Sequence, residues 1–321
     1  MAGISFRNVT KTFPNGKAAV KDFSLEVGDG EFVVLTGPKG SGKATVLRMI
    51  AGMEPISGGE LQIGGQAIKN GSPEKRNVGM IFQHFTLYPG MTVYDNIAFL
   101  MRLKGEPEEK IRPLVEENAR LFKIGKLLPC YPRELNDLQK QYVAMARANV
   151  HDPEAFLMLE LLGSLDASAR KKARDRLKEL YDEIRTTLIY ATDDPEEAAL
   201  LDVRTVIMHR GHVEQVGTIA ELKKNPCNFF VAQFMNGSSF GSSEVQIVKG
   251  KTAVEAMGNS FSIDVPAEWV ERLEKGGYLG KRVLLGYTTC RTFGEEEELE
   301  ETSPEAGCDF FFFDKETRKA I

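Results

Sequence analysis

The alternation of apolar and polar residues over the first 35 positions predicts antiparallel strands. Segments such as ISFRNV and FSLEV have the pattern of a sheet with one buried and one solvated face. EFVVLTG differs, because its apolar run is continuous and ends at a glycine-rich turn. We expect a buried strand there, followed by a helix over KATVLRMIAG.

Similar buried runs recur along the next 180 residues or so of the sequence, with helical stretches such as LDASARKKARDRLKELYDEI between them. The runs are VGMIFQ, AFLMLELL, TTLIYAT and RTVIMHRG. Strands that alternate with helices form parallel sheets, because a crossover helix returns the chain to the same edge. The sequence therefore predicts an α/β fold with a parallel sheet and a glycine loop at one strand end.

The pattern of alternating strands and helices ends near Ser238. We therefore predict two domains, of residues 1–235 and 236–321. SSFGSS has the composition of a linker. After it, EVQIVKG, SFSIDV, RVLLGYT and CDFFFFD predict short strands of a small β-rich domain. The acidic insert GEEEELEETSPEAG is expected to be a solvated loop, because like charges at that density cannot pack together.

Composition and charge narrow the classes of protein. The chain has 321 residues, 42% hydrophobic and 27% charged, as in a soluble globular protein of about two domains. Its net charge is -5, and its lysines and arginines are spread out, which argues against a nucleic-acid partner. No stretch approaches the ~18 apolar residues of a membrane span, and the N-terminus lacks a signal peptide's apolar core. We expect a cytosolic chain.

The cysteines give no sign of a metal site or a disulfide framework. Cys130, Cys227, Cys290 and Cys308 lie far apart and form no C-x-x-C pair. Reduced thiols are therefore the expected state.

The stretch GPKGSGKAT matches the phosphate-binding pattern G-x-x-x-x-G-K-[ST] except at its last position, where Ala44 replaces the hydroxyl residue. It follows a predicted strand and opens a predicted helix, the context that such a loop requires. Backbone N–H groups and the helix N-terminus would bind phosphate oxygens, and Lys43 would reach the β- and γ-phosphates. A chance glycine turn is the alternative. The candidate nucleotide-binding residues of the loop are Gly37, Pro38, Lys39, Gly40, Ser41, Gly42, Lys43, Ala44 and Thr45.

Three longer segments occur in the order and spacing of ATP-binding cassette proteins. They are VGMIFQHFTLYPGMTVYDNIAF, YPRELNDLQKQYVAMARANVHDPEAFLMLELLGSLDASAR and TLIYATDDPEEAALLDVRTVIMHRGHVEQVGT. Up to about residue 235 the chain resembles the ATPase subunits of carbohydrate importers of the maltose and glycerol-phosphate type. The resemblance implies an antiparallel β subdomain, a parallel-sheet core and a helical subdomain. The tail resembles a shortened form of that subgroup's β-rich, OB-like regulatory domain.

The resemblance also implies partners and ligands. Two cassettes, either two copies or this chain with an intact paralogue, would hold ATP between the phosphate loop of one and the signature segment of the other. Phe13 would stack on adenine, although an ordinary aromatic at a strand end is the alternative. Gln83 would face the γ-phosphate and the metal. Residues 84–99 would line the groove that holds the membrane permease subunits.

Several positions depart from the family's pattern where chemistry is expected. The hydroxyl residue that holds Mg²⁺ is Ala44, the acid that helps to hold it is Leu159, and the histidine at the γ-phosphate is Asp193. Glu160 keeps the carboxylate that polarises the attacking water and is the one retained catalytic candidate. Gln83 is the one remaining candidate metal ligand, so the sequence predicts no complete metal site. ATP is the expected cofactor, and Mg²⁺ is doubtful.

The signature segment, L-S-G-G-Q in the family, reads LNDLQ over residues 135–139. Asn136 or Asp137 is expected to cap the following helix. The helix N-terminus that would receive a partner's γ-phosphate then carries its own carboxylate. Asp194, which precedes a proline, is expected to cap another helix, so Asp193 could be only the exposed residue before that cap.

These observations lead to one hypothesis and two alternatives. The first is a nucleotide-binding subunit of a sugar-type importer, peripheral on the inner face of the plasma membrane through its permease, with hydrolysis weak or lost. The second is an active ATPase that energises carbohydrate import with a compensated site. The third is a scaffold or regulatory cassette that binds no nucleotide.

Overall fold

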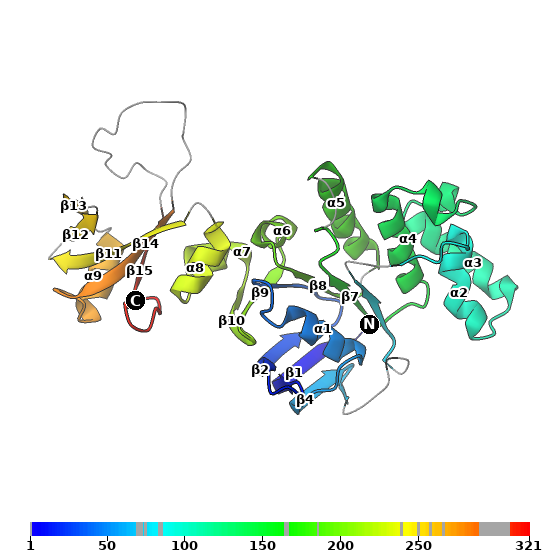
Figure 1. Cartoon of the computed structure of the whole chain (residues 1–321), viewed down its shortest axis with the longest axis horizontal. Coiled ribbons are helices and arrows are strands. Elements are labelled where there is room, and N and C mark those ends of the chain that lie inside the picture. Colours follow the sequence, from blue (N-terminus) through cyan, green and yellow to red (C-terminus); the bar gives the residue numbers. More distant parts are fainter. Residues whose placement is uncertain are drawn as a thin grey trace. The chain divides into compact units, whose positions relative to one another are not determined.

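The protein divides into two compact units, Met1–Val216 and Gly217–Ile321. The structure is a computed structural model that describes residues 2–68, 73, 76–82, 86–163, 167–184, 186–237, 240–248, 251–256, 259–264, 267–288 and 309–321. Figure 1 shows the chain and its labelled elements. Gln83, Cys290, Cys308 and the acidic insert over residues 294–307 lie outside the described residues.

The first unit begins with an antiparallel sheet of strand order β2-β1-β4-β5, as the alternating pattern predicts. In β1 and β2, Ile4 lies opposite Val27 and Phe6 opposite Leu25. The rings of Phe6 and Phe23 pack edge to face with centroids 4.9 Å apart. The strands are β1 (Ile4–Thr12), β2 (Ala18–Val27), β4 (Gly58–Ile63) and β5 (Gln66–Ala67).

The core of the first unit is a six-stranded sheet of order β10-β9-β3-β8-β7-β6, in which the neighbours from β9 to β6 are parallel. Every residue of β3, β7 and β8 is buried, because elements cover both faces of these strands. The predicted parallel sheet is confirmed. Its strands are β3 (Phe32–Thr36), β6 (Val78–Ile81), β7 (Ala155–Leu159), β8 (Thr187–Thr192), β9 (Arg204–His209) and β10 (His212–Gly217).

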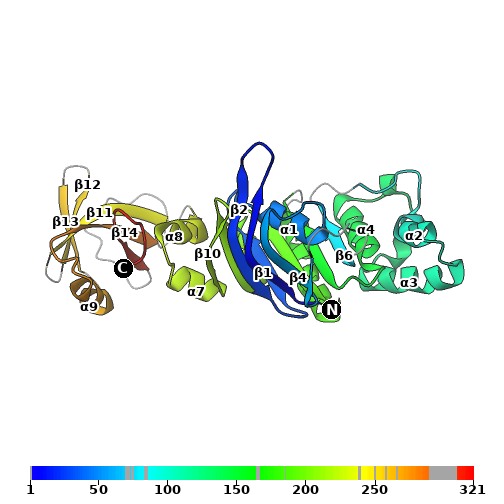
Figure 2. The ribbon, with the colours of Figure 1, turned by 90° about the horizontal axis from the view of Figure 1, so that it is seen from below.

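Helix α1 (Lys43–Ala51) lies between the two sheets and contacts β2, β6, β7 and β8 (Figure 2). The predicted helical subdomain is formed by α2 (Val93–Leu103), α3 (Glu108–Leu121) and α4 (Asp137–Asn149), which pack on one another. Single 3₁₀ turns at Gly125–Leu127 and Pro132–Glu134 connect α3 to α4. Helices α5 (Ala167–Ile184) and α6 (Pro195–Leu201) contact each other, and α6 packs against β3 and β8.

In the residues that the structure describes, the second unit has a small sheet and three helices. Its strand order is β13-β12-β11-β14-β15, and its core includes Leu273, Val283, Leu285 and Phe312. Strand β12 and helix α9 were not expected from the sequence. The elements are α7 (Ile219–Lys224), α8 (Phe229–Asn236), β11 (Phe240–Val248), β12 (Lys251–Ala256), β13 (Asn259–Asp264), α9 (Ala267–Lys275), β14 (Arg282–Thr288) and β15 (Phe310–Phe313).

The division into units precedes residue 235, because α8 packs against β11 and β14 of the second unit. The prediction that SSFGSS is a linker is wrong for residues 240–243, which belong to β11. A Cβ atom on Gly241 would lie 2.5 Å from the ring of Tyr287, and one on Gly286 would lie 2.5 Å from the ring of Phe240. The glycines therefore make room for aromatic rings in the sheet, a reason that composition alone does not reveal.

Candidate functional site

The loop between β3 and α1 has the backbone geometry of a phosphate-binding loop. Gly37 has φ +144°, and a Cβ atom there would lie 2.1 Å from the carbonyl oxygen of Met208. Gly42 has φ +111°, and its Cβ atom would lie 2.7 Å from the carbonyl oxygen of Ala19. Gly42 is also the N-cap of α1, and no side chain accepts a hydrogen bond from the first N–H groups of this helix. These N–H groups can therefore donate to a phosphate bound at the loop.

Lys43 places its ammonium inside this loop. The side chain is buried, and Nζ donates to the carbonyl oxygens of Gly37 at 2.7 Å and Pro38 at 3.2 Å. Burial lowers the pKa of Lys43, while the carboxylates of Glu160 and Asp193 oppose that shift. The lysine thus lies where the phosphate-loop pattern requires a cation.

A pocket of about 410 Å³ lies beside the loop, within the first unit. It brings together Phe13, residues 40–45 and Glu160, which are far apart in the sequence. Phe13 is half-buried, and Lys11 Nζ lies 5.1 Å from the centroid of its ring. Adenine stacking on Phe13 stays a prediction that this position permits.

The remaining predicted loop residues lie outside the pocket lining. Gly37 and Pro38 form the base of the loop and accept hydrogen bonds from Lys43. Lys39 is exposed, and its Nζ lies 3.8 Å from Asp193 Oδ2. Gln83 lies outside the described residues, so its predicted place at the γ-phosphate is untested.

The positions expected to hold Mg²⁺ carry apolar side chains. A P-loop ordinarily supplies a Ser or Thr hydroxyl and an acid at the end of a neighbouring strand. Here Leu159 is 8% exposed and belongs to the apolar core, and Ala44 packs against that same core. Among the described residues, no group of three or more His, Cys, Asp or Glu side chains could hold a metal ion. The donors that these positions offer do not fit Mg²⁺.

Glu160 follows β7 in the left-handed conformation, with φ +49°. Its N–H donates to the carbonyl oxygen of Ala191 at 2.7 Å, which fixes the backbone at the end of β7. The side chain lines the pocket beside Lys43. Glu160 thus places a carboxylate next to the loop. The preceding residue, where the family's pattern has a metal-binding acid, is Leu159.

The turn after β8 places two aspartates differently. Asp194 caps α6, and its Oδ1 accepts from the N–H of Glu196 at 2.8 Å, as predicted. Asp193 precedes that cap, and its side chain is 32% exposed. Both interpretations of Asp193, a site residue or only the residue before a cap, therefore stay open.

A buried carboxylate that the sequence did not single out lies on α6. Glu197 is 5% exposed and accepts hydrogen bonds from the hydroxyls of Tyr190 at 2.6 Å and Thr192 at 2.7 Å. Burial raises the pKa of Glu197. The signal in the sequence is weak, because DPEEAALL matches an ordinary solvated helix start.

The signature segment forms a well-capped helix start. Asn136 is the N-cap of α4, and its Oδ1 accepts from the N–H of Gln139 at 2.8 Å. Gln139 Oε1 accepts from the N–H of Asn136 at 2.9 Å, which completes a capping box. Asp137 is therefore the first helical residue and not the cap. Its exposed carboxylate lies 3.2 Å from Lys140 Nζ.

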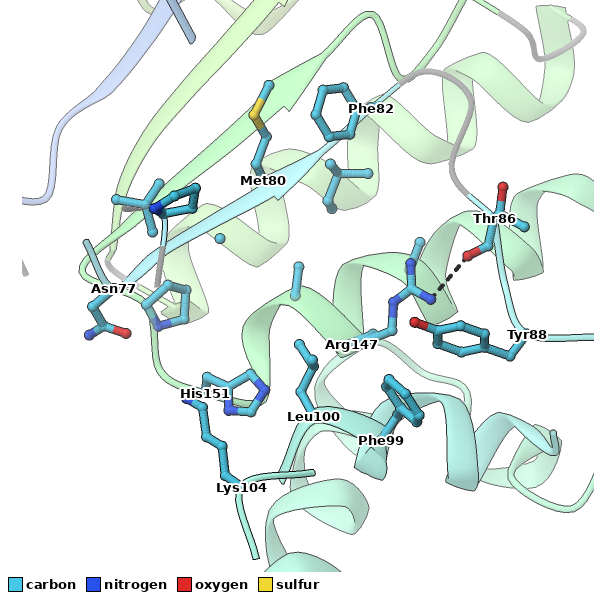
Figure 3. Close-up of a pocket in the computed structure, with 17 residues that line it drawn as sticks. Asn77, Met80, Phe82, Thr86, Tyr88, Phe99, Leu100, Lys104, Arg147 and His151 are labelled. Carbon is cyan, nitrogen blue, oxygen red and sulfur yellow. Dashed lines mark hydrogen bonds between the residues drawn. The ribbon is translucent and has the colours of Figure 1, made fainter. Parts of the chain in front are cut away.

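A second pocket, of about 650 Å³, lies beside β6, α2 and α4 (Figure 3). The predicted segment 84–99 contributes Thr86, Tyr88 and Phe99, while residues 84 and 85 lie outside the described residues. The rings of Tyr88 and Phe99 lie 4.6 Å apart. Arg147 donates to the carbonyl oxygen of Thr86 at 3.0 Å and lies 5.7 Å from the centroid of Tyr88.

The sequence missed more than half of this groove's lining. Met80 and Phe82 come from β6 and the residue after it, and Leu100 comes from α2. His151 lines one end, beside Lys104 in Figure 3. Burial, and secondarily the charge of Lys104, lower the pKa of His151. These residues meet only because β6, α2 and α4 come together in the fold.

Comparison with known proteins agrees with this geometry. Residues 20–160 match the family model described as ABC transporter. The sn-glycerol-3-phosphate import ATP-binding protein UgpC of Ralstonia nicotianae is 40% identical over 286 residues, covering 89% of this chain and 78% of that protein. The chain belongs to the ABC transporter family of ATP-binding proteins. The cassette is similar to UgpC of Rhodopseudomonas palustris as well, at 44% identity over 73% of this chain and 65% of that protein.

Solved structures support the fold. CbiO1 from Clostridium perfringens, part of the ABC transporter complex cbiONQ, is similar with a TM-score of 0.63 and 23% identity, over 70% of this chain and 95% of that chain. An ATP-binding cassette solved as a dimer in a post-hydrolysis state with ADP and phosphate has a TM-score of 0.59 and 28% identity, over 67% of this chain and 98% of that chain. The predicted fold class is thus confirmed. In the described part of the cassette, no helix is both long and apolar enough to span a bilayer.

Proposed function

We propose that this cassette is the nucleotide-binding subunit of a carbohydrate-type importer, of the kind named for sn-glycerol-3-phosphate, and that it hydrolyses ATP slowly or not at all. The relatives named above supply the class of solute. The observation that carries the proposal is the phosphate loop, with Gly37 and Gly42 in conformations that require glycine and Lys43 buried at its centre. The cassette would act as a pair, as related cassettes do.

Slow hydrolysis follows from what the site lacks. Phosphoryl transfer depends on a metal ion that stabilises charge by several kcal/mol. Ala44 and Leu159 offer no oxygen to such an ion. This chain has Asp193 where the family's pattern has a histidine that contacts the γ-phosphate. Removal of one such preorganised donor typically lowers the rate about 10²–10³-fold. The losses do not simply add, because these groups act as a unit.

Phosphate release tests this part of the proposal. The chain is reconstituted with its membrane subunits in liposomes, and hydrolysis is compared with that of Glu160→Gln. We expect a rate near background and no difference between the two. A clear rate that Glu160→Gln removes would support the active, compensated ATPase instead.

Nucleotide binding itself is tested by thermal unfolding. A ligand that binds only the native state at 100 times its Kd stabilises it by about 2.7 kcal/mol. ATP at millimolar concentration is therefore expected to raise the Tm, and Lys43→Ala is expected to abolish the rise. An unchanged Tm in the parent chain would favour the scaffold that binds no nucleotide.

The groove beside α2 is the proposed contact with the membrane permease. Its wall combines apolar side chains, such as Phe99 and Leu100, with the cations Lys104 and Arg147, and no carboxylate is among those of its lining residues that the structure describes. Leu103, which is 73% exposed, lies next to the groove on the same helix. An apolar segment of the permease that carries an acidic residue would complement this surface.

A matched pair of leucines tests the groove. Leu100 lines it, whereas Leu114 on α3 is equally exposed, at 40%, and does not. Leu100→Glu is expected to weaken co-purification with the permease about tenfold or more, and Leu114→Glu to leave it unchanged. Equal effects of the two variants would contradict docking at this groove.

A further inference from the structure

Three cations outside the phosphate loop line the nucleotide pocket. Lys17 comes from the turn between β1 and β2, Lys21 from β2, and Arg210 from the turn between β9 and β10. The N–H of Lys21 donates to the carbonyl oxygen of Gly211 at 2.9 Å, so β2 and the second turn are held together. The fold thus assembles one cationic wall from segments almost 190 residues apart.

These three side chains are unpaired within the part of the chain that the structure describes. All three are exposed, and none makes a side-chain hydrogen bond or an ion pair there. Other cations of the same unit behave differently: Lys11 lies 2.9 Å from Glu54, and Arg204 lies 2.9 Å from Glu31. Unpaired charges of one sign on a pocket wall favour a ligand of the opposite sign.

The charges of the pocket lining are unbalanced. Among the lining residues that the structure describes, Lys43 adds a fourth cation, and Glu160 is the one carboxylate. A nucleoside triphosphate without its divalent ion is more negative than the metal complex by the charge of that ion. A site that has no side-chain oxygen at the two positions expected to hold the ion, Ala44 and Leu159, but has additional cations therefore matches the metal-free form.

We infer that the pocket takes its nucleotide as the metal-free anion, with Lys17, Lys21 and Arg210 supplying positive charge in place of Mg²⁺. This inference rests on the nucleotide binding proposed above. It explains how a loop can keep Lys43 and its glycines while Ala44 and Leu159 lie against the apolar core. Metal-free binding also agrees with slow hydrolysis, since the ion is what assists phosphoryl transfer.

Calorimetric titration with ATP, once in Mg²⁺ and once in EDTA, tests the inference on the full chain. We expect binding in EDTA to be as tight as in Mg²⁺ or tighter. The triple variant Lys17→Gln, Lys21→Gln, Arg210→Gln is expected to lose about tenfold in affinity in EDTA, because each exposed charge contributes modestly. Added KCl should weaken binding in EDTA more steeply for the parent than for the triple variant.

A second triple variant controls for the change in net charge. Lys171→Gln, Lys172→Gln, Lys178→Gln removes the same number of exposed cations from α5, outside the pocket, and is expected to bind like the parent. If the two triple variants bind equally in EDTA, the inference is wrong. Thermal unfolding without nucleotide checks that both variants are folded, and Lys21→Gln alone serves if the pocket variant is not.

The outcomes separate the inference from the proposed function. Binding that requires Mg²⁺ would overturn the metal-free inference and leave nucleotide binding intact. Absence of ATP binding in both buffers would overturn the proposed function as well.

Discussion

Lys39 Nζ lies 3.8 Å from Asp193 Oδ2, so an ion pair joins the phosphate loop to the end of β8. The lysine side chain is 87% exposed and the aspartate 32%, and a pair this exposed stabilises the fold by at most about 1 kcal/mol. The carboxylate also acts on Lys43, whose charged form it favours. Asp193 therefore matters less for folding than for the charge that an incoming phosphate meets.

Replacement of Asp193 by asparagine should tighten ATP binding several-fold. The neutral side chain removes a negative charge that competes with the phosphates for Lys39 and Lys43. The Tm without nucleotide should hardly change, since surface substitutions usually stay within about 0.5 kcal/mol. Titration in EDTA measures the effect, with Asp182→Asn on α5 as the control. Equal affinities for Asp193→Asn and the parent would show that Asp193 is only the residue before a helix cap.

Ala44→Ser combined with Leu159→Asp should restore Mg²⁺-dependent ATP binding. The two changes supply the hydroxyl and the acid that a P-loop uses to hold the ion. They should also lower the Tm, because Leu159 is 8% exposed and a carboxylate there loses much of its hydration. Titrations with and without Mg²⁺ measure the gain, and Ala44→Ser alone is the better-folded comparison. A folded double variant with no metal dependence would show that these positions are assigned wrongly.

Glu197→Gln should flatten the pH dependence of stability above pH 4.5. Burial raises the pKa of Glu197 above its ordinary 4.5, so the native state holds the proton more tightly than the unfolded chain does. Its contribution is therefore fully present below pH 4.5 and is lost as pH rises through the raised pKa. Glutamine still offers an oxygen to the hydroxyls of Tyr190 and Thr192.

Urea unfolding at several pH values measures this slope. The neighbouring Glu196 is exposed, so Glu196→Gln is the matched control and should keep the parent's slope. The role given to Glu197 is wrong if both variants show the same pH dependence.

Asn136→Ala should lower stability by about 1 kcal/mol, because it removes the side-chain cap of α4. Asn136→Ser keeps a capping oxygen and should cost much less. Neither change should affect ATP binding by the isolated chain, since Asn136 does not line its nucleotide pocket. Thermal unfolding and titration measure the two effects separately. A loss of ATP affinity in Asn136→Ala would contradict this separation.

Several elements of the fold were predictable because their causes are local. The alternation over ISFRNV and FSLEV gave the antiparallel strands, and the continuous run FVVLT gave the buried strand β3. The glycine loop was recognisable because Gly37 and Gly42 adopt backbone conformations that side chains rarely take. Helix α9 was missed, although Trp269 and Leu273 are four residues apart, which is a helical spacing.

Other features depended on contacts between distant residues. Residues 240–243 of the SSFGSS segment belong to β11, where Gly241 makes room for Tyr287, some 46 positions away. Glu197 became buried because Tyr190 and Thr192 of β8 donate to it. The groove required β6, α2 and α4 to meet, and of the described residues in the predicted segment, Thr86, Tyr88 and Phe99 lie in its wall.

The sequence by itself determined the alternation of strands and helices in the first unit, the glycine loop and the residues at positions 44 and 159, because residue identity and short spacing carry this information. The tertiary structure decided that Leu159 is buried in the apolar core, that Ala44 contacts both this core and the pocket, and that Lys17, Lys21 and Arg210 share one pocket wall. The burial of a side chain and the net charge of a pocket depend on residues that are far apart in the chain. Both are therefore fixed only when the two sheets and α1 pack together.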